Sequence, residues 1–183
     1  MKFSSTLIAG AAAATLISGI ASAQEAKKFE GIYGGVEAGV DWTKLAIDGK
    51  RDRSIYYGGV LGYRMQSDTD TVFGLEGTFG DTGYKQLGQR DTDYEYGASL
   101  ILGQAFGPDG ANLFYGKAGY VRTRLDFGDA ADVGKTTEDG WRFGAGYERA
   151  LSNGLSLRTG LDYTTYGDGM KQWTAKTGLL ASF

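Results

Sequence analysis

Apolar and polar residues alternate along most of the chain after about residue 30. From residue 32 to residue 42 every second residue is apolar, and the residues between them are small, aromatic or charged. A helix would place Glu37 and Val40 on one side and interrupt any apolar stripe, whereas a strand puts them on opposite faces. The pattern therefore predicts a β-strand with one apolar and one polar face.

The same alternation recurs seven more times, which gives eight predicted strands. The further segments are 57–64, 73–80, 94–103, 113–124, 141–148, 155–163 and 173–183. The connections at 66–71, 107–111 and 152–154 are short, and Asn153-Gly154 is a favoured tight-turn dipeptide. Those at 43–53, 81–93 and 125–140 are longer and more polar, although 167–171 is short. Short turns at one end and mostly long loops at the other are typical of transmembrane β-barrels.

The polar face is predicted to line the inside of such a barrel. Many glycines fall on this face, among them Gly62, Gly74, Gly144 and Gly178. The interior of an eight-stranded barrel is only just wide enough for side chains, so glycine makes room for a neighbouring charged residue. Buried charges must be paired, and the polar face carries five acidic and five basic residues. The predicted lumen ion-pair network consists of Glu37, Arg64, Glu76, Glu95, Lys117, Arg142, Glu148, Arg158, Asp162 and Lys176.

Aromatic residues on the apolar face are predicted to form two belts. One belt lies near the long-loop ends and contains Trp42, Tyr57, Phe79, Tyr94, Trp141, Tyr163 and Trp173. The other lies near the short turns and contains Tyr63, Phe73, Phe106, Phe114, Tyr147 and Phe183. Two aromatic belts around an aliphatic band match the two interfaces of a bilayer. The alternative class is a soluble periplasmic barrel. In such a barrel nothing would concentrate the aromatic residues at two levels along the barrel axis.

The bilayer also constrains closure and register. In lipid every backbone polar group must be paired, so segment 173–183 is expected to pair with segment 32–42 and leave no sheet edge. In segment 113–124, Lys117 must avoid the apolar face, which places Phe114 and Tyr120 on that face. Arg122 and Arg124 then share the apolar parity, and we expect them to lie beyond the membrane edge.

Composition narrows the possibilities further. Residues 1–23 are typical of a secretory signal peptide, with Lys2, an apolar stretch and Ala21-Ser22-Ala23, and residues 24–183 are expected to form one barrel domain. The chain has no cysteine and no histidine, which excludes disulfide scaffolds, thiolate or imidazole metal sites and the Ser-His-Asp triad. We assign no cofactor and no metal. The net charge of −3 argues against nucleic-acid binding.

The chain resembles the small eight-stranded outer-membrane β-barrel proteins of Gram-negative bacteria, in particular the OmpA-like and "porin family" proteins of α-proteobacteria. The resemblance rests on the segments IYGGVEAGVDW, YYGGVLGYRM, VFGLEGTFGD, LFYGKAGYVRTRL, GWRFGAGYE and TGLLASF. It implies an all-β, up-and-down transmembrane barrel in the cell outer membrane. The last segment, with Gly178 and Phe183, resembles the C-terminal signal recognised by the barrel-assembly machinery, although Ala181 replaces the aromatic residue usually favoured there.

The sequence favours a structural or surface barrel whose paired lumen charges close it. A narrow channel for ions or small solutes is the alternative, because inward glycine and serine leave gaps. Enzymes among outer-membrane barrels depend on histidine as families, so we expect no catalysis, and we interpret Glu138 and Asp139 as solvated loop charges. Expected partners are outer-membrane lipid, lipopolysaccharide, the barrel-assembly machinery and a possible surface ligand. The loop residues considered for such binding are Lys44, Lys50, Arg51, Arg53, Asp81, Tyr84, Lys85, Arg90 and Asp129.

Overall fold

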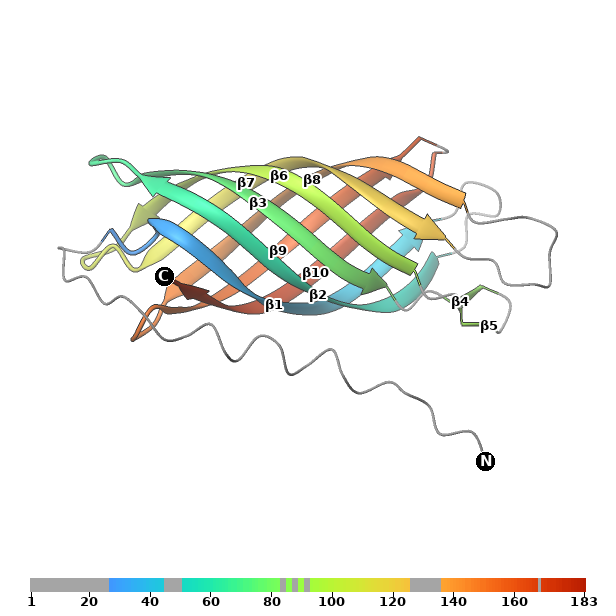
Figure 1. Ribbon diagram of the computed structural model, residues 1–183, viewed down its shortest axis with the longest axis horizontal. Coiled ribbons are helices and arrows are strands. Elements are labelled where there is room, and N and C mark those ends of the chain that lie inside the picture. The colour runs from blue at the N-terminus through green and yellow to red at the C-terminus, as the bar shows by residue number, and fades with distance from the viewer. Residues whose placement is uncertain are drawn as a thin grey trace, which may run out of the picture.

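Eight long strands form a closed antiparallel barrel (Figure 1). The computed structural model describes residues 27–44, 51–82, 85–86, 89–90, 93–125, 136–167 and 169–183, so the predicted signal peptide lies outside the described residues. The barrel strands are β1 (Gly31–Lys44), β2 (Arg51–Gln66), β3 (Thr71–Thr82), β6 (Asp93–Phe106), β7 (Asn112–Leu125), β8 (Thr136–Ala150), β9 (Leu155–Tyr166) and β10 (Lys171–Ser182). Within the described residues no helix is long and apolar enough to cross a membrane.

Successive barrel strands are neighbours around the ring, and β1 closes it by pairing with β10. Val36 in β1 lies opposite Leu179 in β10 and opposite Gly59 in β2. This confirms the predicted pairing of the last strand with the first. Because every barrel strand has two hydrogen-bonded neighbours, the barrel has no free sheet edge.

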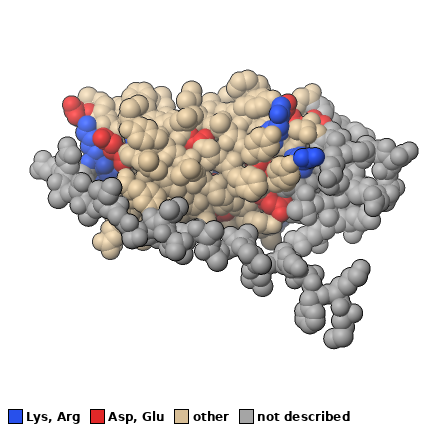
Figure 2. All heavy atoms as spheres, viewed as in Figure 1, with Lys and Arg blue, Asp and Glu red and all other residues tan. Residues whose placement is uncertain are grey.

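The two faces of the wall have the predicted polarity. Outward-facing Leu61 and Leu100 are 65% and 68% exposed, whereas inward-facing Glu76 is fully buried. In β7, Phe114 faces outward and Lys117 faces the lumen, so the register predicted for this segment is correct. On the face drawn in Figure 2, charged side chains gather toward the two ends of the barrel and the wall between them is largely uncharged.

Several strand boundaries differ from the prediction. β8 begins at Thr136 rather than at residue 141. The predicted loop 43–53 is shorter than expected, because β1 continues to Lys44 and β2 begins at Arg51. The predicted loop 81–93 also contains a short two-stranded hairpin of β4 (Lys85–Gln86) and β5 (Gln89–Arg90). These additions lie past the apolar band, where both faces of a strand are polar and alternation gives no signal.

The tight connection between β8 and β9 follows from its sequence. Asn153 and Gly154 both adopt positive φ, 60° and 73°, a conformation that Asn and Gly tolerate better than other residues. The Leu151 N–H donates to the Leu155 carbonyl at 2.7 Å and closes the hairpin.

Candidate functional site

The barrel lumen is the candidate site, because the charged residues of the inward face meet there. The structure places all ten residues of the predicted network inside the barrel, each 7% exposed or less. Each of them makes at least one ion pair with another member of the set. The lumen is therefore filled by mutually compensating charges.

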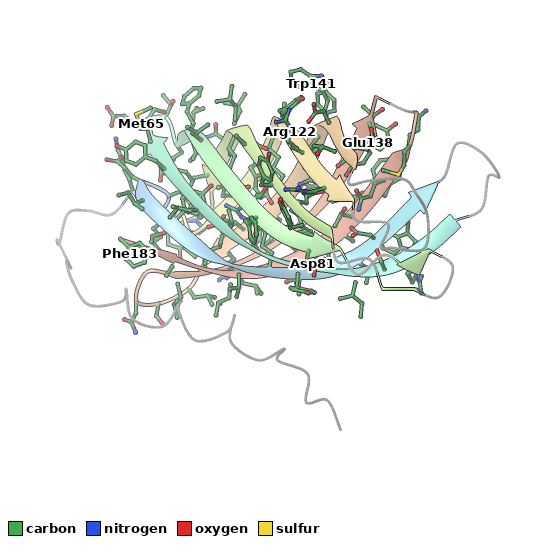
Figure 3. The ribbon with its side chains drawn as sticks, turned by 45° about the vertical axis from the view of Figure 1, so that its right-hand side comes forward. Met65, Asp81, Arg122, Glu138, Trp141 and Phe183 are labelled. Atoms are coloured by element: carbon green, nitrogen blue, oxygen red, sulfur yellow. The ribbon has the colours of Figure 1, made fainter. Side chains whose placement is uncertain are left out.

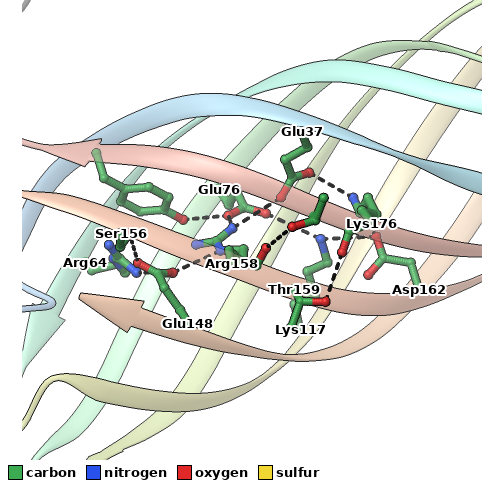
Figure 4. Close-up of polar contacts among 12 residues, drawn as sticks. Glu37, Arg64, Glu76, Lys117, Glu148, Ser156, Arg158, Thr159, Asp162 and Lys176 are labelled. Atoms are coloured by element: carbon green, nitrogen blue, oxygen red, sulfur yellow. Dashed lines mark hydrogen bonds and ion pairs between the residues drawn. The ribbon is translucent and has the colours of Figure 1, made fainter. Parts of the chain in front are cut away.

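Arg158 in β9 joins three acidic residues from different strands (Figure 4). Its Nη1 lies 2.5 Å from Glu76 Oε2 and 3.8 Å from Glu37 Oε1, and its Nε donates to Glu148 Oε2 at 2.9 Å. Glu148 also accepts from Arg64 Nη1 at 2.9 Å and from the Ser156 hydroxyl at 2.6 Å. Because charge-assisted hydrogen bonds in a low-dielectric interior polarise one another, this arrangement holds the side chains in fixed positions.

Two lysines extend the network toward the loop end. Lys117 Nζ lies 3.5 Å from Glu76 Oε1 and 3.2 Å from Asp162 Oδ2. Lys176 Nζ lies 2.8 Å from the same Asp162 oxygen and 3.1 Å from Glu37 Oε2. Eight of the ten charged residues thus form one connected network, contributed by seven of the eight barrel strands, all except β6.

A second, smaller group lies closer to the loops. Arg142 Nη2 lies 2.6 Å from Glu95 Oε1, and its Nε donates to the Thr164 hydroxyl at 3.0 Å. The Tyr166 hydroxyl donates to Gln172 Oε1 at 2.9 Å and lies 3.3 Å from Glu95 Oε2. Asp41, which was not among the predicted network residues, is also fully buried on the inward face and lies opposite Thr174 of β10.

Sequence reasoning missed the lumen tyrosines. Each stands opposite a glycine of a neighbouring strand: Tyr33 opposite Gly62, Tyr56 opposite Gly39 and Tyr115 opposite Gly146. A Cβ added at Gly62 would lie 2.5 Å from the Tyr33 ring. The inward glycines therefore make room for aromatic rings as well as for charges. The sequence pattern that could have located these tyrosines is a tyrosine on the polar face of one strand opposite a glycine of the next.

These rings also contact the cations. The Arg64 guanidinium carbon lies 3.9 Å from the centroid of the Tyr33 ring, and the Arg158 carbon lies 5.0 Å from that of Tyr115. The Tyr33 hydroxyl donates to Glu76 at 2.7 Å. Cation–π contacts of this kind strengthen when they are desolvated, so the tyrosines are part of the charged network.

The turn end of the lumen is filled by apolar side chains, which the prediction of a polar interior did not include. A buried cluster there contains Phe29, Tyr33, Val60, Val72, Ile101, Ala105, Leu113, Tyr115 and Leu180. Phe29 precedes β1 and is fully buried, and its N–H donates to the Gln66 side chain at 3.1 Å. Gly31, at φ 102°, permits the reversal that turns the chain from this segment into the wall.

Residues 27–30, which we call the N-terminal strap, are held to two turns by ion pairs. Lys27 Nζ lies 2.8 Å from Asp68 Oδ1, and Lys28 Nζ lies 3.5 Å from Asp109 Oδ2. The hydrogen bond between Lys27 and Asp68 raises the pKa of the lysine above its usual value and lowers that of the carboxyl. The pKa of Asp109 is lowered chiefly by the hydrogen bond from the Ala111 N–H.

The outer surface carries aromatic side chains at both ends. Trp141 lies at the loop end and Phe183 at the turn end (Figure 3). Near the loops the rings of Tyr163 and Trp173 lie 4.9 Å apart, and near the turns those of Phe106 and Phe114 lie 4.9 Å apart. The outward-facing members 36% exposed or more are Tyr57, Tyr63, Phe73, Phe79, Tyr94, Phe106, Phe114, Trp141, Trp173 and Phe183, while Trp42, Tyr147 and Tyr163 are partly buried.

The outer surface near the loops also carries charge. Arg122 Nε donates to Asp139 Oδ1 at 2.6 Å, and Arg124 Nη1 donates to the Tyr94 hydroxyl at 2.9 Å. Glu138 and Asp139 lie within β8 and not in a loop, which corrects the interpretation from the sequence. The reason is that β7 and β8 remain paired beyond the apolar band.

Only part of the predicted loop surface lies within the described residues. Arg53 stacks over Trp42 with its guanidinium carbon 5.7 Å from the ring centroid, and Asp81 accepts from the Tyr57 hydroxyl at 2.5 Å. Lys50, Tyr84 and Asp129 lie outside the described residues, as do the side chains of Lys44, Arg51, Lys85 and Arg90. Among the side chains that are described, no group of three or more His, Cys, Asp or Glu residues is arranged to hold a metal ion.

The family model for the outer membrane protein beta-barrel domain matches residues 9–183. The chain belongs to this family. As an outer-membrane barrel, it crosses the membrane with its eight long strands. In barrels of this kind the short turns face the periplasm and the longer loops face the exterior.

The relatives of this outer-membrane barrel include outer-membrane proteins of two Brucella species. It is 30% identical over 145 residues to the 31 kDa outer-membrane immunogenic proteins of Brucella melitensis biotype 1 and Brucella suis biovar 1. The match covers 75% of this chain and 55% of each relative, so the chain spans about half the length of those proteins.

Solved structures show the same fold. Neisserial surface protein A has a TM-score of 0.64 and 20% identity, over 84% of this chain and 98% of that one. The N-terminal β-barrel domain of OprF from Pseudomonas aeruginosa has a TM-score of 0.60 and 17% identity, over 84% and 98%. Ail, the attachment invasion locus protein of Yersinia pestis, has a TM-score of 0.55 and 20% identity, over 84% and 99%.

Proposed function

We propose that this outer-membrane barrel is a non-enzymatic structural and surface protein whose lumen is closed and whose loops are displayed to the exterior. The observation that carries the proposal is the set of ion pairs that cross the lumen. Arg64 of β2 reaches Glu148 of β8, and Arg158 of β9 reaches Glu76 of β3. In the strand order each of these pairs joins strands that stand opposite each other in the ring.

The energetics favour a lumen that stays closed. Opening a path requires ion pairs such as that of Arg158 and Glu148 to separate where water is scarce. At a low effective dielectric the attraction between two charges is several times larger than in water. The apolar cluster around Phe29 adds a second obstruction at the periplasmic end. Two barriers of different chemistry therefore lie in series along the lumen.

Recordings from planar lipid bilayers test the proposal against the alternative of a narrow channel. Folded wild-type protein is expected to insert without producing conductance steps above baseline. Folding is verified on a gel, where a compact barrel migrates differently before and after boiling. Reproducible single-channel steps from protein that passes this check would contradict the closed lumen and support the channel.

Display of the loops is supported by the fixed geometry of the strands that carry them. Arg122 and Asp139 clamp β7 to β8 at the base of connection 126–135, and Tyr57 is tied to Asp81 between β2 and β3. Rigid scaffolds of this kind commonly carry binding loops. The assay compares wild type with a variant in which residues 127–134 are replaced by Asn-Gly, by measuring adhesion of whole cells to host surfaces. Equal adhesion at equal surface levels would rule out this loop as a binding site.

Biogenesis is part of the same proposal. Gly178 lies opposite Glu37, and the Phe183 N–H donates to the Ile32 carbonyl at 2.8 Å, so both residues belong to the seam between β1 and β10. Their recognition by the barrel-assembly machinery stays a prediction. A Phe183→Ala variant is expected to reach the outer membrane in reduced amount, as measured by membrane fractionation, and an unchanged amount would contradict the role.

A further inference from the structure

The membrane-facing wall of the barrel is hollowed over β7, β8 and β9. The hollow has a volume of about 730 Å³. Its floor contains the small residues Gly116 and Ala145, which lie opposite each other in neighbouring strands. Its sides are formed by Phe114, Tyr147, Thr159 and Leu161. We call this feature the β8 groove.

The β8 groove is closed toward the lumen by one ring. Gly146 of β8 lies opposite Gly160 of β9, so neither residue sends a side chain inward. The space behind them is taken by Tyr115, whose hydroxyl would lie 3.0 Å from a Cβ added at Gly160. The groove is therefore a depression in the outer wall, open to the acyl chains of the bilayer and separated from the lumen charges.

A cation lies at the periplasmic end of the groove. Arg149 is two residues beyond Tyr147 in β8, which is about 7 Å along a strand, and it shares the outward parity of Tyr147. Asn112 Oδ1 accepts from the Tyr147 hydroxyl at 2.7 Å and from Arg149 Nη1 at 3.0 Å. Among the described residues no carboxylate lies within ion-pair distance of Arg149.

The position of Arg149 sets it apart from the other cations. The lysines of the N-terminal strap are paired with Asp68 and Asp109, and Arg64 is buried in the lumen. Arg149 is the only basic residue among the described strand residues that face outward at the periplasmic end. An exposed arginine at this level lies among the lipid headgroups, and an apolar groove runs from it toward the middle of the membrane.

We propose that the β8 groove is a binding site for one glycerophospholipid of the periplasmic leaflet. Arg149 binds the phosphate, because a guanidinium matches phosphate oxygens in charge and geometry. One acyl chain lies over Gly116 and Ala145, against the aromatic pair of Phe114 and Tyr147, whose ring centroids are 5.4 Å apart. Asn112 orients both the arginine and the tyrosine hydroxyl. The site does not depend on whether the lumen conducts.

Photocrosslinking tests this site. The folded protein is reconstituted with a trace of phosphatidylglycerol that carries a diazirine on one acyl chain, and adducts are mapped by mass spectrometry of peptides. Adducts are expected to concentrate on residues 114–116, 145–147 and 159–161. Excess unlabelled phosphatidylglycerol should reduce the labelling, whereas diacylglycerol, which has the same chains without the phosphate, should not. Competition by lipopolysaccharide alone would assign the phosphate to a different lipid and overturn the proposal.

Two variants and a matched control separate the headgroup from the chain. Arg149→Gln is expected to weaken phosphatidylglycerol competition about fivefold, the size expected for one basic residue near an anionic lipid surface. Ala145→Phe fills the groove and should abolish the concentrated labelling. Ala98→Phe introduces the same ring at an outward-facing alanine of β6, away from the groove, and should leave the labelling unchanged. Labelling spread evenly around the barrel in wild type, or equal effects of the two phenylalanine variants, would overturn the site.

Discussion

Arg158 Nη1 in β9 lies 2.5 Å from Glu76 Oε2 in β3, and the two strands stand opposite each other in the barrel. The pair therefore bridges the full width of the lumen. Both side chains are almost completely buried, at 3% and 0% exposure. The stability of the barrel and the closure of its lumen consequently depend on the same side chains.

Removing Arg158 should strongly destabilise the barrel. An Arg158→Met variant leaves Glu76 and Glu148 with one fewer cation in a buried site, and breaking such a pair costs about 3–5 kcal/mol. Urea unfolding in lipid vesicles, followed by tryptophan fluorescence, measures the change. Arg122→Met is the control, since Arg122 pairs with Asp139 on the exposed surface, where such pairs contribute about 1 kcal/mol or less. Equal losses in the two variants would contradict a buried network.

The fit between Tyr33 and Gly62 should be sensitive to a single methyl group. Gly62→Ala places a Cβ against the Tyr33 ring, and overpacking of this kind costs about 1–3 kcal/mol. Gly59→Ala is the matched control in the same strand, because its Cβ meets nothing closer than 3.6 Å. Adding Tyr33→Leu to Gly62→Ala should recover part of the loss. Simple additivity of the two changes in a double-mutant cycle would show that the residues are not coupled.

The N-terminal strap should be held less firmly at both extremes of pH. The pKa of Asp68 is lowered by Lys27, so its contribution is present above about 3.8 and is lost as the pH falls through the lowered value. The pKa of Lys27 is raised, so its contribution is present below about 10.5 and is lost as the pH rises through the raised value. Exchange of the Phe29 amide, measured by NMR in micelles, should therefore be slowest between these limits after correction for intrinsic rates. In Asp68→Asn the acidic loss should shrink to the part that comes from the Lys28–Asp109 pair, and an unchanged profile would refute this account.

All three tryptophans, Trp42, Trp141 and Trp173, should lie near the extracellular interface. Lipids brominated close to the headgroup are expected to quench the fluorescence of the folded protein more than lipids brominated near the chain ends. The reason is that the tryptophans lie at the loop ends of β1, β8 and β10, with Trp42 opposite Trp173 across the seam. Stronger quenching from the deeper bromines would show that this belt lies inside the aliphatic band.

The architecture could be predicted because the bilayer leaves few alternatives. Alternation of period two gave the strands, and the need to bury Lys117 settled the register of β7. The ten inward charges could be identified by parity. Their partners could not, because Arg64 and Glu148 are 84 residues apart and meet only when the ring closes.

Two features were hidden from the sequence for physical reasons. Phe29 precedes the first alternating segment, so nothing in the pattern placed it inside the barrel. Tyr33, Tyr56 and Tyr115 lie on the polar face of their strands. Their packing depends on a glycine in a neighbouring strand and on a cation from a third strand. Such three-part contacts arise from closure and leave no local periodicity.

The seam between β1 and β10 joins two strands that are far apart in the chain, with Tyr33 opposite Ser182. Until this seam forms, both strands expose a row of unpaired backbone groups that lipid cannot satisfy. Two lumen charges also lose a contact, because Lys176 of β10 meets Glu37 of β1 across the same seam. The final pairing therefore satisfies the backbone edges of both strands and brings Lys176 to Glu37 in the same step, so closing the ring and completing this part of the lumen network are one event.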